Sequence, residues 1–516
     1  MSLASSAQSR AAEGAERLTA SVDQAPEQRA IQRNGPTTVG VSRRRLSLTT
    51  GLQLVARAVA AALGAVLAAT LARALGPMQF GHLSIALMLA SIAGNVGDFG
   101  LAQVAVREMA SSPSRRPPLL GALIALRFVS GVVLATCFGL VAALLISDTE
   151  PRRAAFWILL TLPLGAITAL QTAAQVRLRP ELTAFLLLLQ SGSWLVIVVL
   201  LAQRHASLSA YGIGFLATNI MLAITTWFSI RRLTIISFPK VRKHTFQLLR
   251  LAWPLGVAGL FVTAYYRLDS IIVYQAVGPV PAAHYAAAYR FLDFLQILPV
   301  TGLTILLPVI SALRGGQAGN PQIARLYQAA LVIAAAFALP LVAGGVLLAP
   351  KLVDLVYGPS FSPASRLLAV LLPSFISISF GYVLSGLLVA ADQVRFIGLT
   401  TATAAIINIA ASLLLVPKHG AMAAAILTVV TEYSVTTVFL LKVTRIMGVS
   451  PPWTRIVRCL VATCVMGWIT YLLRSLPIAV NLVVSAAIYG ACLLATRTFK
   501  RSDLRLVLGS KGSLRA

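Results

Sequence analysis

Charged residues are scarce in this sequence, and acidic residues are the scarcest of them. Only 11% of its 516 residues are Asp, Glu, Lys or Arg, whereas 58% are hydrophobic and the mean hydropathy is +0.84. Such a chain cannot cover a water-soluble surface, and its apolar runs are long enough to cross a bilayer. The sequence therefore predicts an all-α, polytopic membrane protein.

The sequence also lacks the motifs and loops in which an enzyme would place its chemistry. It has no P-loop, no HExxH and no paired carboxylates in a soluble segment, and no outer connection is long enough to form a domain. We therefore expect no catalytic residue, no bound metal and no cofactor. Four cysteines lie singly in apolar runs, and we interpret them as small core residues: Cys137, Cys459, Cys464 and Cys492.

The net charge of +28 results from 43 basic and only 15 acidic residues. The basic residues gather in alternate connections, which is typical of membrane orientation and not of a nucleic-acid-binding stripe. By the positive-inside rule we expect both termini in the cytoplasm. The longest basic connection, from Arg231 to Arg250, can also meet anionic membrane lipids, although a simple positive-inside loop explains it as well.

The apolar runs predict about fourteen spans, arranged as two sets of six and a final pair. They lie near 51–72, 80–106, 119–146, 154–174, 182–202, 208–230, 248–275, 283–311, 323–349, 366–390, 396–416, 420–441, 454–473 and 477–496. The predicted organisation is a disordered tail (1–45), an N-lobe (46–232), a basic linker (233–247), a C-lobe (248–445), a helix pair (446–497) and a basic tail (498–516).

A short pattern occurs twice at a constant separation, which indicates an internal repeat of the kind found in transporters. Gly76-Pro77, His82 and Ala86 correspond to Gly278-Pro279, His284 and Ala288. Both histidines are predicted to lie at helix starts near the outer surface, as interfacial residues and not as ligands.

Eight charged residues lie inside the predicted spans, where a charge normally faces a protein interior or a watery cavity. They are Arg57, Asp98, Arg127, Arg267, Asp269, Arg290, Asp293 and Glu432. The first three lie about 9–12 Å from the cytoplasmic ends of their spans and can form one cluster. The next four lie toward the outer ends of the seventh and eighth spans, and Glu432 lies near the middle of the twelfth.

Depth along the seventh and eighth spans predicts two ion pairs between these helices, Arg267 with Asp293 and Asp269 with Arg290. Pairing of Arg290 with Asp293 along one helix face is the alternative. Arginine suits phosphate, whereas an exporter of cations would more naturally present carboxylates. Local pairing that only holds helices together, or snorkelling of Arg57 and Arg127 to the headgroups, remains a competing interpretation.

Four segments, in this order, resemble the oligosaccharide flippases of bacterial polysaccharide synthesis, within the multidrug, oligosaccharidyl-lipid and polysaccharide exporter superfamily. They are ARALGPMQFGHLSIALMLASIAGNVGDFGLAQVAVREMA (72–110), RLDSIIVYQAVGPVPAAHYAAAYRF (267–291), YGPSF (357–361) and NIAASLLLVPKHGAMAAAILTVVTE (408–432). The resemblance implies two six-helix lobes around a central cavity and alternating access. It also implies outward movement of an undecaprenyl-diphosphate-linked oligosaccharide across the inner membrane.

This resemblance implies a cationic cavity that holds the diphosphate and sugar. Our candidates for substrate binding are the four arginines Arg57, Arg127, Arg267 and Arg290, and those for gating or coupling are Asp98, Asp269, Asp293 and Glu432. Coupling to a proton or sodium gradient is possible, and a polysaccharide polymerase and export machinery are potential partners.

Two other functions fit the sequence less well. A cation-coupled small-molecule exporter of the same superfamily is disfavoured by the interior arginines, and a membrane-embedded polysaccharide polymerase by the short outer loops. The sequence does not identify the sugar, the polysaccharide pathway, the coupling ion, the oligomeric state or the role of the last two helices.

The alternation of basic connections makes a topology prediction. Reporter fusions after Arg232 and Arg445 should be active only as cytoplasmic reporters, whereas a fusion at Gly278 should report the outside. The measurement is the activity of paired cytoplasmic and periplasmic reporters. A cytoplasmic signal at Gly278 would overturn the predicted orientation.

Overall fold

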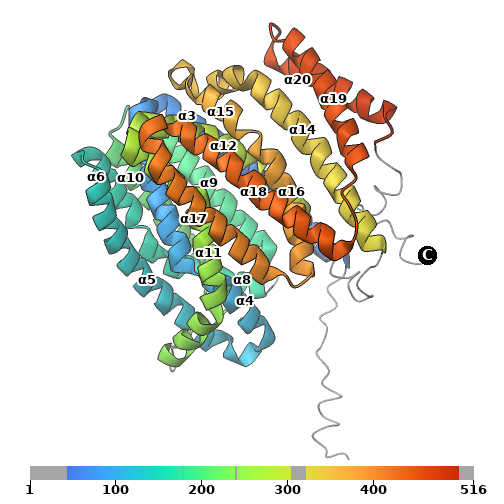
Figure 1. Ribbon diagram of the computed structural model, residues 1–516. Helices are drawn as coiled ribbons and strands as arrows, with labels where there is room; N and C mark the ends of the chain where they lie inside the picture. Colours follow the sequence, from blue (N-terminus) through green and yellow to red (C-terminus); the bar gives the residue numbers. More distant parts are fainter. Residues whose placement is uncertain (1–42, 178, 239–240, 304–320, 499–516) are drawn as a thin grey trace, which may run out of the picture. The chain divides into compact units, whose positions relative to one another are not determined.

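The computed structural model describes residues 43–177, 179–238, 241–303 and 321–498 (Figure 1). Most of the predicted tails, Lys240 of the linker, and the end of the eighth predicted span lie outside these residues. The chain divides into two compact units, Met1–Gly51 and Leu52–Ala516, and every contact given below lies within the second.

All regular structure in the described residues is helical. The helices of the first half are α3 (Arg43–Asp98), α4 (Leu101–Ser111), α5 (Arg116–Leu145), α6 (Thr149–Leu159), α7 (Gly165–Thr168), α8 (Gln171–Val176), α9 (Pro180–Gln203) and α10 (Leu208–Ile230). Those of the second half are α11 (Val241–Val277), α12 (Pro279–Leu295), α14 (Pro321–Tyr357), α15 (Ala364–Leu371), α16 (Ser374–Ala390), α17 (Val394–His419), α18 (Ala421–Met447), α19 (Trp453–Leu472) and α20 (Ile478–Ala495). Short 3₁₀ turns occupy Pro113–Arg115, Leu162–Leu164 and Pro359–Phe361.

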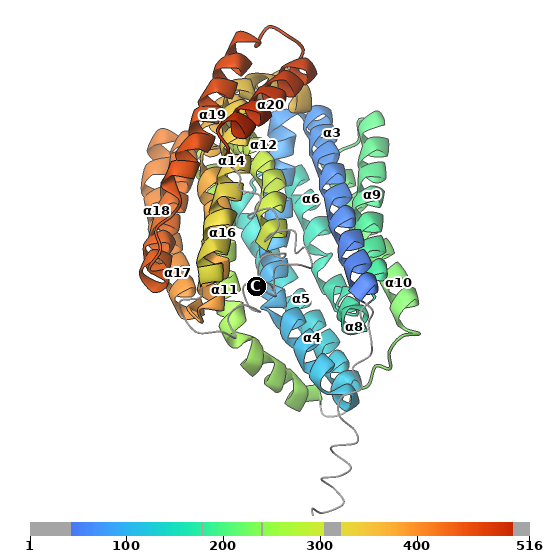
Figure 2. The same ribbon diagram turned by 90° about the vertical axis from the view of Figure 1, so that its right-hand side faces the viewer.

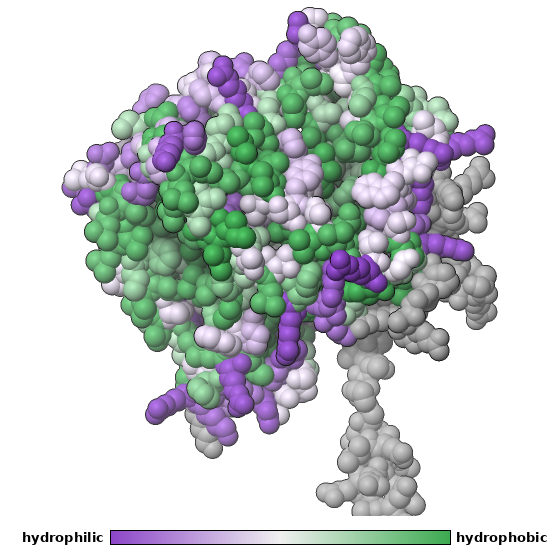
Figure 3. Space-filling view, viewed as in Figure 1, coloured by the Kyte–Doolittle hydropathy of each residue, from purple (hydrophilic) through white to green (hydrophobic). Residues whose placement is uncertain are grey.

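Twelve segments of the described chain are long and apolar enough to cross a membrane, so the protein is a multi-pass membrane protein. This number is lower than the fourteen counted from sequence. Two predicted spans merge into one 61-residue segment, Gly51–Ser111, and α12, with 17 residues, is not counted. Figure 3 shows hydrophobic side chains over most of one face, with hydrophilic ones mainly toward its margins.

Two stretches that were predicted to lie outside the spans are helical. Arg43–Arg45, predicted to end a disordered tail, begin α3, and residues 241–247 of the predicted linker form the first turns of α11. The cysteine interpretation holds for Cys459, which is buried, and is wrong for Cys137 and Cys464, which are exposed.

Three Gly-Pro steps share one backbone conformation. Gly76 has φ 68° and ψ 173°, Gly278 has φ 94° and ψ 178°, and Gly358 has φ 86° and ψ 174°. Glycine adopts positive φ without a Cβ clash, and the proline that follows is well placed in the first turn of a helix. The matched geometry of Gly76 and Gly278 supports the internal repeat, and Gly358 adds a third copy of the turn.

The connections that contain these three glycines pack closely together, and we call this side of the molecule the Gly278 end. A Cβ atom on Gly81 would lie 2.1 Å from the carbonyl oxygen of Pro279. Arg73 donates hydrogen bonds to the carbonyl oxygens of Leu355 and Val356 near the end of α14. Backbone of the two halves is therefore in direct contact at this end.

Both repeat histidines are buried at the Gly278 end, so the prediction that they are interfacial is wrong. His82 Nδ1 lies 2.7 Å from the Tyr274 hydroxyl, and its Nε2 lies 3.7 Å from Asp148 Oδ2. His284 packs edge-on against Phe361. Tyr274 of the second half thus covers His82, and Phe361 of its own half covers His284, contacts that apolar runs alone do not reveal.

The last two helices pack beside α14 (Figures 1 and 2). The Tyr489 hydroxyl of α20 donates a hydrogen bond to the Ala336 carbonyl oxygen at 2.8 Å. At the Gly278 end, Lys351 Nζ donates to the carbonyl oxygens of Arg474 and Leu476 at 2.5 and 3.1 Å. The final helix pair is therefore attached to α14 along its length.

Substitution of Gly81 should test the close contact between the halves. Gly81→Ala should lower the free energy of unfolding by about 1–3 kcal/mol, because the added methyl group overlaps the Pro279 carbonyl oxygen. Gly139→Ala is the control, since a Cβ there meets nothing within 4 Å. Denaturant unfolding in detergent measures both, and equal stability of the two variants would contradict the contact.

Candidate functional site

The charged side chains of the first half form one ion pair in the bundle interior. Arg127 on α5 lies with its Nη1 3.5 Å from Asp98 Oδ1 at the end of α3. Its guanidinium group faces Gly97 and Gly165, whose missing side chains leave room for it. Because an isolated charge at this depth is costly, each residue of the pair stabilises the other.

Arg127 also lines a small cavity of about 120 Å³. Four of the other lining residues are polar: Ser130, Thr161, Thr168 and Asn219. The Nε atom of Arg127 is buried and has no hydrogen-bond partner within the described residues. One buried donor of the residue that lines this cavity is therefore left without a partner in the described chain.

Arg57 does not join this pair. Its side chain is exposed, and it forms no ion pair with any described residue. The predicted cluster of three is therefore reduced to Asp98 and Arg127.

In the second half, one carboxylate faces two arginines. Asp293 Oδ2 of α12 lies 3.8 Å from Arg267 Nη1 on α11 and 3.9 Å from Arg290 Nη1 on its own helix. The predicted cross-helix pair Arg267–Asp293 is confirmed, and so is the alternative pairing along the helix. The group carries a net positive charge, because two arginines share one acid.

The second predicted cross-helix pair, Asp269 with Arg290, is wrong. Asp269 is 4% exposed and accepts hydrogen bonds from the Tyr285 hydroxyl and, at 2.7 Å, from the Ser270 backbone N–H. The Tyr285 hydroxyl also lies 3.3 Å from Thr428 Oγ1 of α18. Hydrogen bonds, and not a paired cation, thus compensate the burial of this carboxyl group.

Glu432 is the other deeply buried acid of the second half. Glu432 lies on α18 and is only 5% exposed. Its carboxyl group lies beside the hydroxyl groups of Tyr265 and Tyr266. Its Oε1 atom has no hydrogen bond of ordinary geometry within the described residues. On the preceding residue, Thr431 Oγ1 accepts a hydrogen bond from Asn408 of α17 at 2.9 Å.

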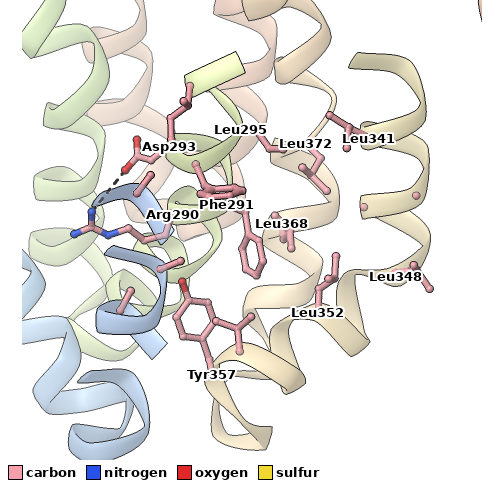
Figure 4. A pocket seen from close by; sticks show the side chains of 18 of the residues that line it. Arg290, Phe291, Asp293, Leu295, Leu341, Leu348, Leu352, Tyr357, Leu368 and Leu372 are labelled. Carbon is pink, nitrogen blue, oxygen red and sulfur yellow. Dashed lines mark ion pairs between the residues drawn. The ribbon is translucent and has the colours of Figure 1, made fainter. Parts of the chain in front are cut away.

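A cavity of about 650 Å³ opens beside the Asp293 group, between α3, α12, α14 and α15 (Figure 4). Arg290 and Asp293 are its charged lining residues, and Arg290 is 52% exposed. The remaining wall is apolar apart from the Tyr357 side chain, and Leu482 of α20 contributes to it. The cavity therefore combines a cationic group with a long hydrophobic surface.

The sequence prediction missed the tyrosines of this region. Tyr285, Tyr265 and Tyr266 lie within apolar runs and count as hydrophobic in any periodicity argument. A signal was nevertheless present, because buried tyrosine hydroxyls need hydrogen-bond partners and these spans contain few acidic residues. Two buried acids near such tyrosines are the natural partners.

Comparison with known proteins agrees with this architecture. A family model described as "Polysaccharide biosynthesis protein" matches residues 70–366. No curated protein sequence matches the chain.

Several solved structures share the fold at low sequence identity. The lipid II flippase MurJ in an inward closed conformation has a TM-score of 0.74 at 15% identity, covering 86% of this chain and 99% of that one. An inward-facing multidrug resistance MATE family transporter of the MOP superfamily has a TM-score of 0.61 at 17% identity, covering 75% of this chain and 95% of that one. A MOP superfamily transporter from Pyrococcus furiosus has a TM-score of 0.55 at 16% identity, covering 76% of this chain and 95% of that one. The chain therefore has the MOP superfamily fold.

A double-mutant cycle should separate the observed ion pair from the absent one. Arg267→Gln and Asp293→Asn should be coupled by about 0.5–3 kcal/mol in the free energy of unfolding, because their charged groups are in contact. Asp269→Asn and Arg290→Gln should be additive within about 0.5 kcal/mol, because these two residues share no direct contact. Denaturant unfolding in detergent gives the free energies of unfolding of the four single and two double mutants. Coupling in the second cycle alone would contradict the arrangement.

Proposed function

Because this chain belongs to the polysaccharide biosynthesis protein family, we propose that it moves an undecaprenyl-diphosphate-linked oligosaccharide outward across the bacterial inner membrane. The product would serve exopolysaccharide, capsule or O-antigen synthesis, with a polysaccharide polymerase and export machinery acting after it. The similarity in fold to a lipid II flippase, whose name denotes a lipid-linked substrate, agrees with this class of cargo.

The observation that carries the proposal is the chemistry of the 650 Å³ cavity. A lipid diphosphate has an anionic head and a hydrocarbon tail, and the cavity offers Arg290 beside an apolar wall that includes Leu348, Leu352 and Leu372. Arginine presents a fork of donors that matches phosphate oxygens. A soluble sugar nucleotide has no hydrocarbon chain that could contact the apolar wall.

Arg267, Arg290 and Arg127 are the proposed contacts for the diphosphate and the first sugars. An arriving diphosphate can compete with Asp293 for its two arginines, and with Asp98 for Arg127, which gives both acids a gating role. Arg57, which is exposed and without an ion pair in the described chain, would receive the headgroup when the site opens to the cytoplasm.

We propose fourteen spans in two six-helix lobes, a final helix pair and cytoplasmic termini. The segment Gly51–Ser111 would be about 90 Å long as a straight helix, three times the thickness of the hydrocarbon core, so it crosses twice with its turn at Gly76. α12 and the residues after it supply the other additional crossing. The close contact of the halves at the Gly278 end supports alternating access with that end, the outer one, closed.

Asp269 and Glu432 are the proposed coupling residues. Both are buried acids that form no ion pair in the described chain, so each can take up a proton, or bind a small cation with the neighbouring hydroxyl oxygens. A proton or sodium gradient would thereby favour one state of the second lobe over the other.

A cation-coupled small-molecule exporter is the second candidate. The same two buried acids favour it, together with the fold similarity to a multidrug transporter. Such a protein would bind its cargo at carboxylates, whereas the exposed part of the present site is cationic. Neighbouring genes for glycosyltransferases and a polymerase would support the flippase.

Removal of Arg290 should impair transport. In cells, Arg290→Gln should reduce polysaccharide output at least about tenfold and cause the lipid-linked oligosaccharide to accumulate on the cytoplasmic face, because one charge-assisted contact with the diphosphate is lost. Arg204→Gln, exposed in the connection after α9, is the control with the same charge change. Extraction and analysis of lipid-linked oligosaccharides measures the effect at matched protein levels.

Arg57→Ala with Arg127→Ala tests the inward-open contacts in the same assay and should also block output. Deletion of the gene without accumulation of any lipid-linked oligosaccharide would contradict the proposed function itself. Accumulation on deletion, with normal output in Arg290→Gln, would contradict only the assigned site.

A further inference from the structure

A third cavity lies at the opposite side of the bundle from the Gly278 end. It has a volume of about 170 Å³, opens to the surface, and is lined by α4, α5, α8 and the connection from α10 to α11. Figure 2 shows the ends of α4, α5 and α8 gathered at this side, where the connection also passes. Its size fits one phosphate group and little more.

Two arginines line this cavity. Arg116, at the start of α5, donates a hydrogen bond from Nε to the Met109 carbonyl oxygen at 2.7 Å, which fixes the direction of its guanidinium group. Arg177 follows the last turn of α8 and is exposed. Neither forms an ion pair in the described chain, so two like charges share one cavity without an acid.

The connection that lines the cavity packs closely against α5. The Ser237 N–H donates to the Pro117 carbonyl oxygen at 3.4 Å, and the Ser237 carbonyl oxygen lies where a Cβ of Gly121 would be, at 2.1 Å. Ile235, a lining residue, is 75% exposed, and Phe238 is 56% exposed. Apolar side chains thus stand exposed beside the arginine pair, an arrangement typical of a membrane interface.

We propose that this cavity binds the phosphate of an anionic membrane lipid. A phosphodiester would accept hydrogen bonds from Arg116 and Arg177, and the acyl chains would lie over Ile235 and Phe238. Free phosphate shares the headgroup chemistry but has no use for the exposed apolar residues. Bound lipid would hold the α10–α11 connection to α5 and α8, and so stabilise the junction between the two halves of the chain.

The proposal is independent of the transported cargo and is tested by lipid-dependent melting of the purified full chain in detergent. Phosphatidylglycerol should raise the melting temperature, whereas phosphatidylcholine and inorganic phosphate should not. Arg177→Gln should weaken the apparent affinity for phosphatidylglycerol about tenfold, equivalent to about 1.4 kcal/mol. Since Arg177 has no ion pair in the described chain, the lipid-free melting temperature should be unchanged.

Arg179→Gln is the matched control, because Arg179 is exposed two residues away and does not line the cavity. It should keep the affinity for phosphatidylglycerol within about twofold, since a single screened surface charge contributes little. Equal losses in Arg177→Gln and Arg179→Gln would overturn the proposal in favour of diffuse attraction to a basic surface. Equal stabilisation by inorganic phosphate would overturn the assignment to a lipid.

Discussion

The high cost of an uncompensated charge in an apolar interior governs the arrangement of this protein. A charge at membrane depth needs a partner of opposite sign, a set of hydrogen bonds or access to water. Asp98 and Arg127 use the first solution and Asp269 the second, through Tyr285 and Ser270. The Asp293 group combines partners of opposite sign with access to water, because its one carboxylate does not neutralise two arginines and Arg290 faces a cavity. The excess positive charge at that point is what makes an anionic ligand the best match.

The Gly278 end adds a geometric constraint to the electrostatic one. Two backbones approach within contact distance at Gly81 and Pro279, and only a residue without a side chain permits this. Around that contact, Arg73, His82 and Gln275 each reach a partner in the other half of the chain. Apolar and aromatic side chains of both halves pack together around these polar contacts, so the contact between the halves combines both kinds of interaction. Under the proposed alternating access, this is the contact that would separate when the Gly278 end opens.

The sequence predicted the helical class and the repeat, because these depend on composition and on spacing along the chain. Depth correctly paired Arg267 with Asp293. It failed for Asp269 and Arg290 because depth says nothing about direction around the helix axis. Tyr285 and Arg290 lie about 140° apart around α12 at 100° per residue, so Asp269 cannot face both. Which side of α12 faces α18 and which faces the cavity is decided by packing of distant segments, and no single-helix pattern contains that information.

The same limit explains why the role of the last two helices could not be read from their sequence. Their apolar runs predict spans and nothing more. In the structure α19 and α20 pack on α14, and Leu482 of α20 reaches the wall of the cavity whose charged part is Arg290 and Asp293. Gly344 and Gly345 of α14 also line this cavity, and the Leu372 side chain packs closely on α14 at Gly345, where an added Cβ would lie 2.7 Å from it. Helix α20 therefore extends the hydrophobic side of the cavity, and the lining best matches a ligand that is apolar over most of its length and anionic at one point.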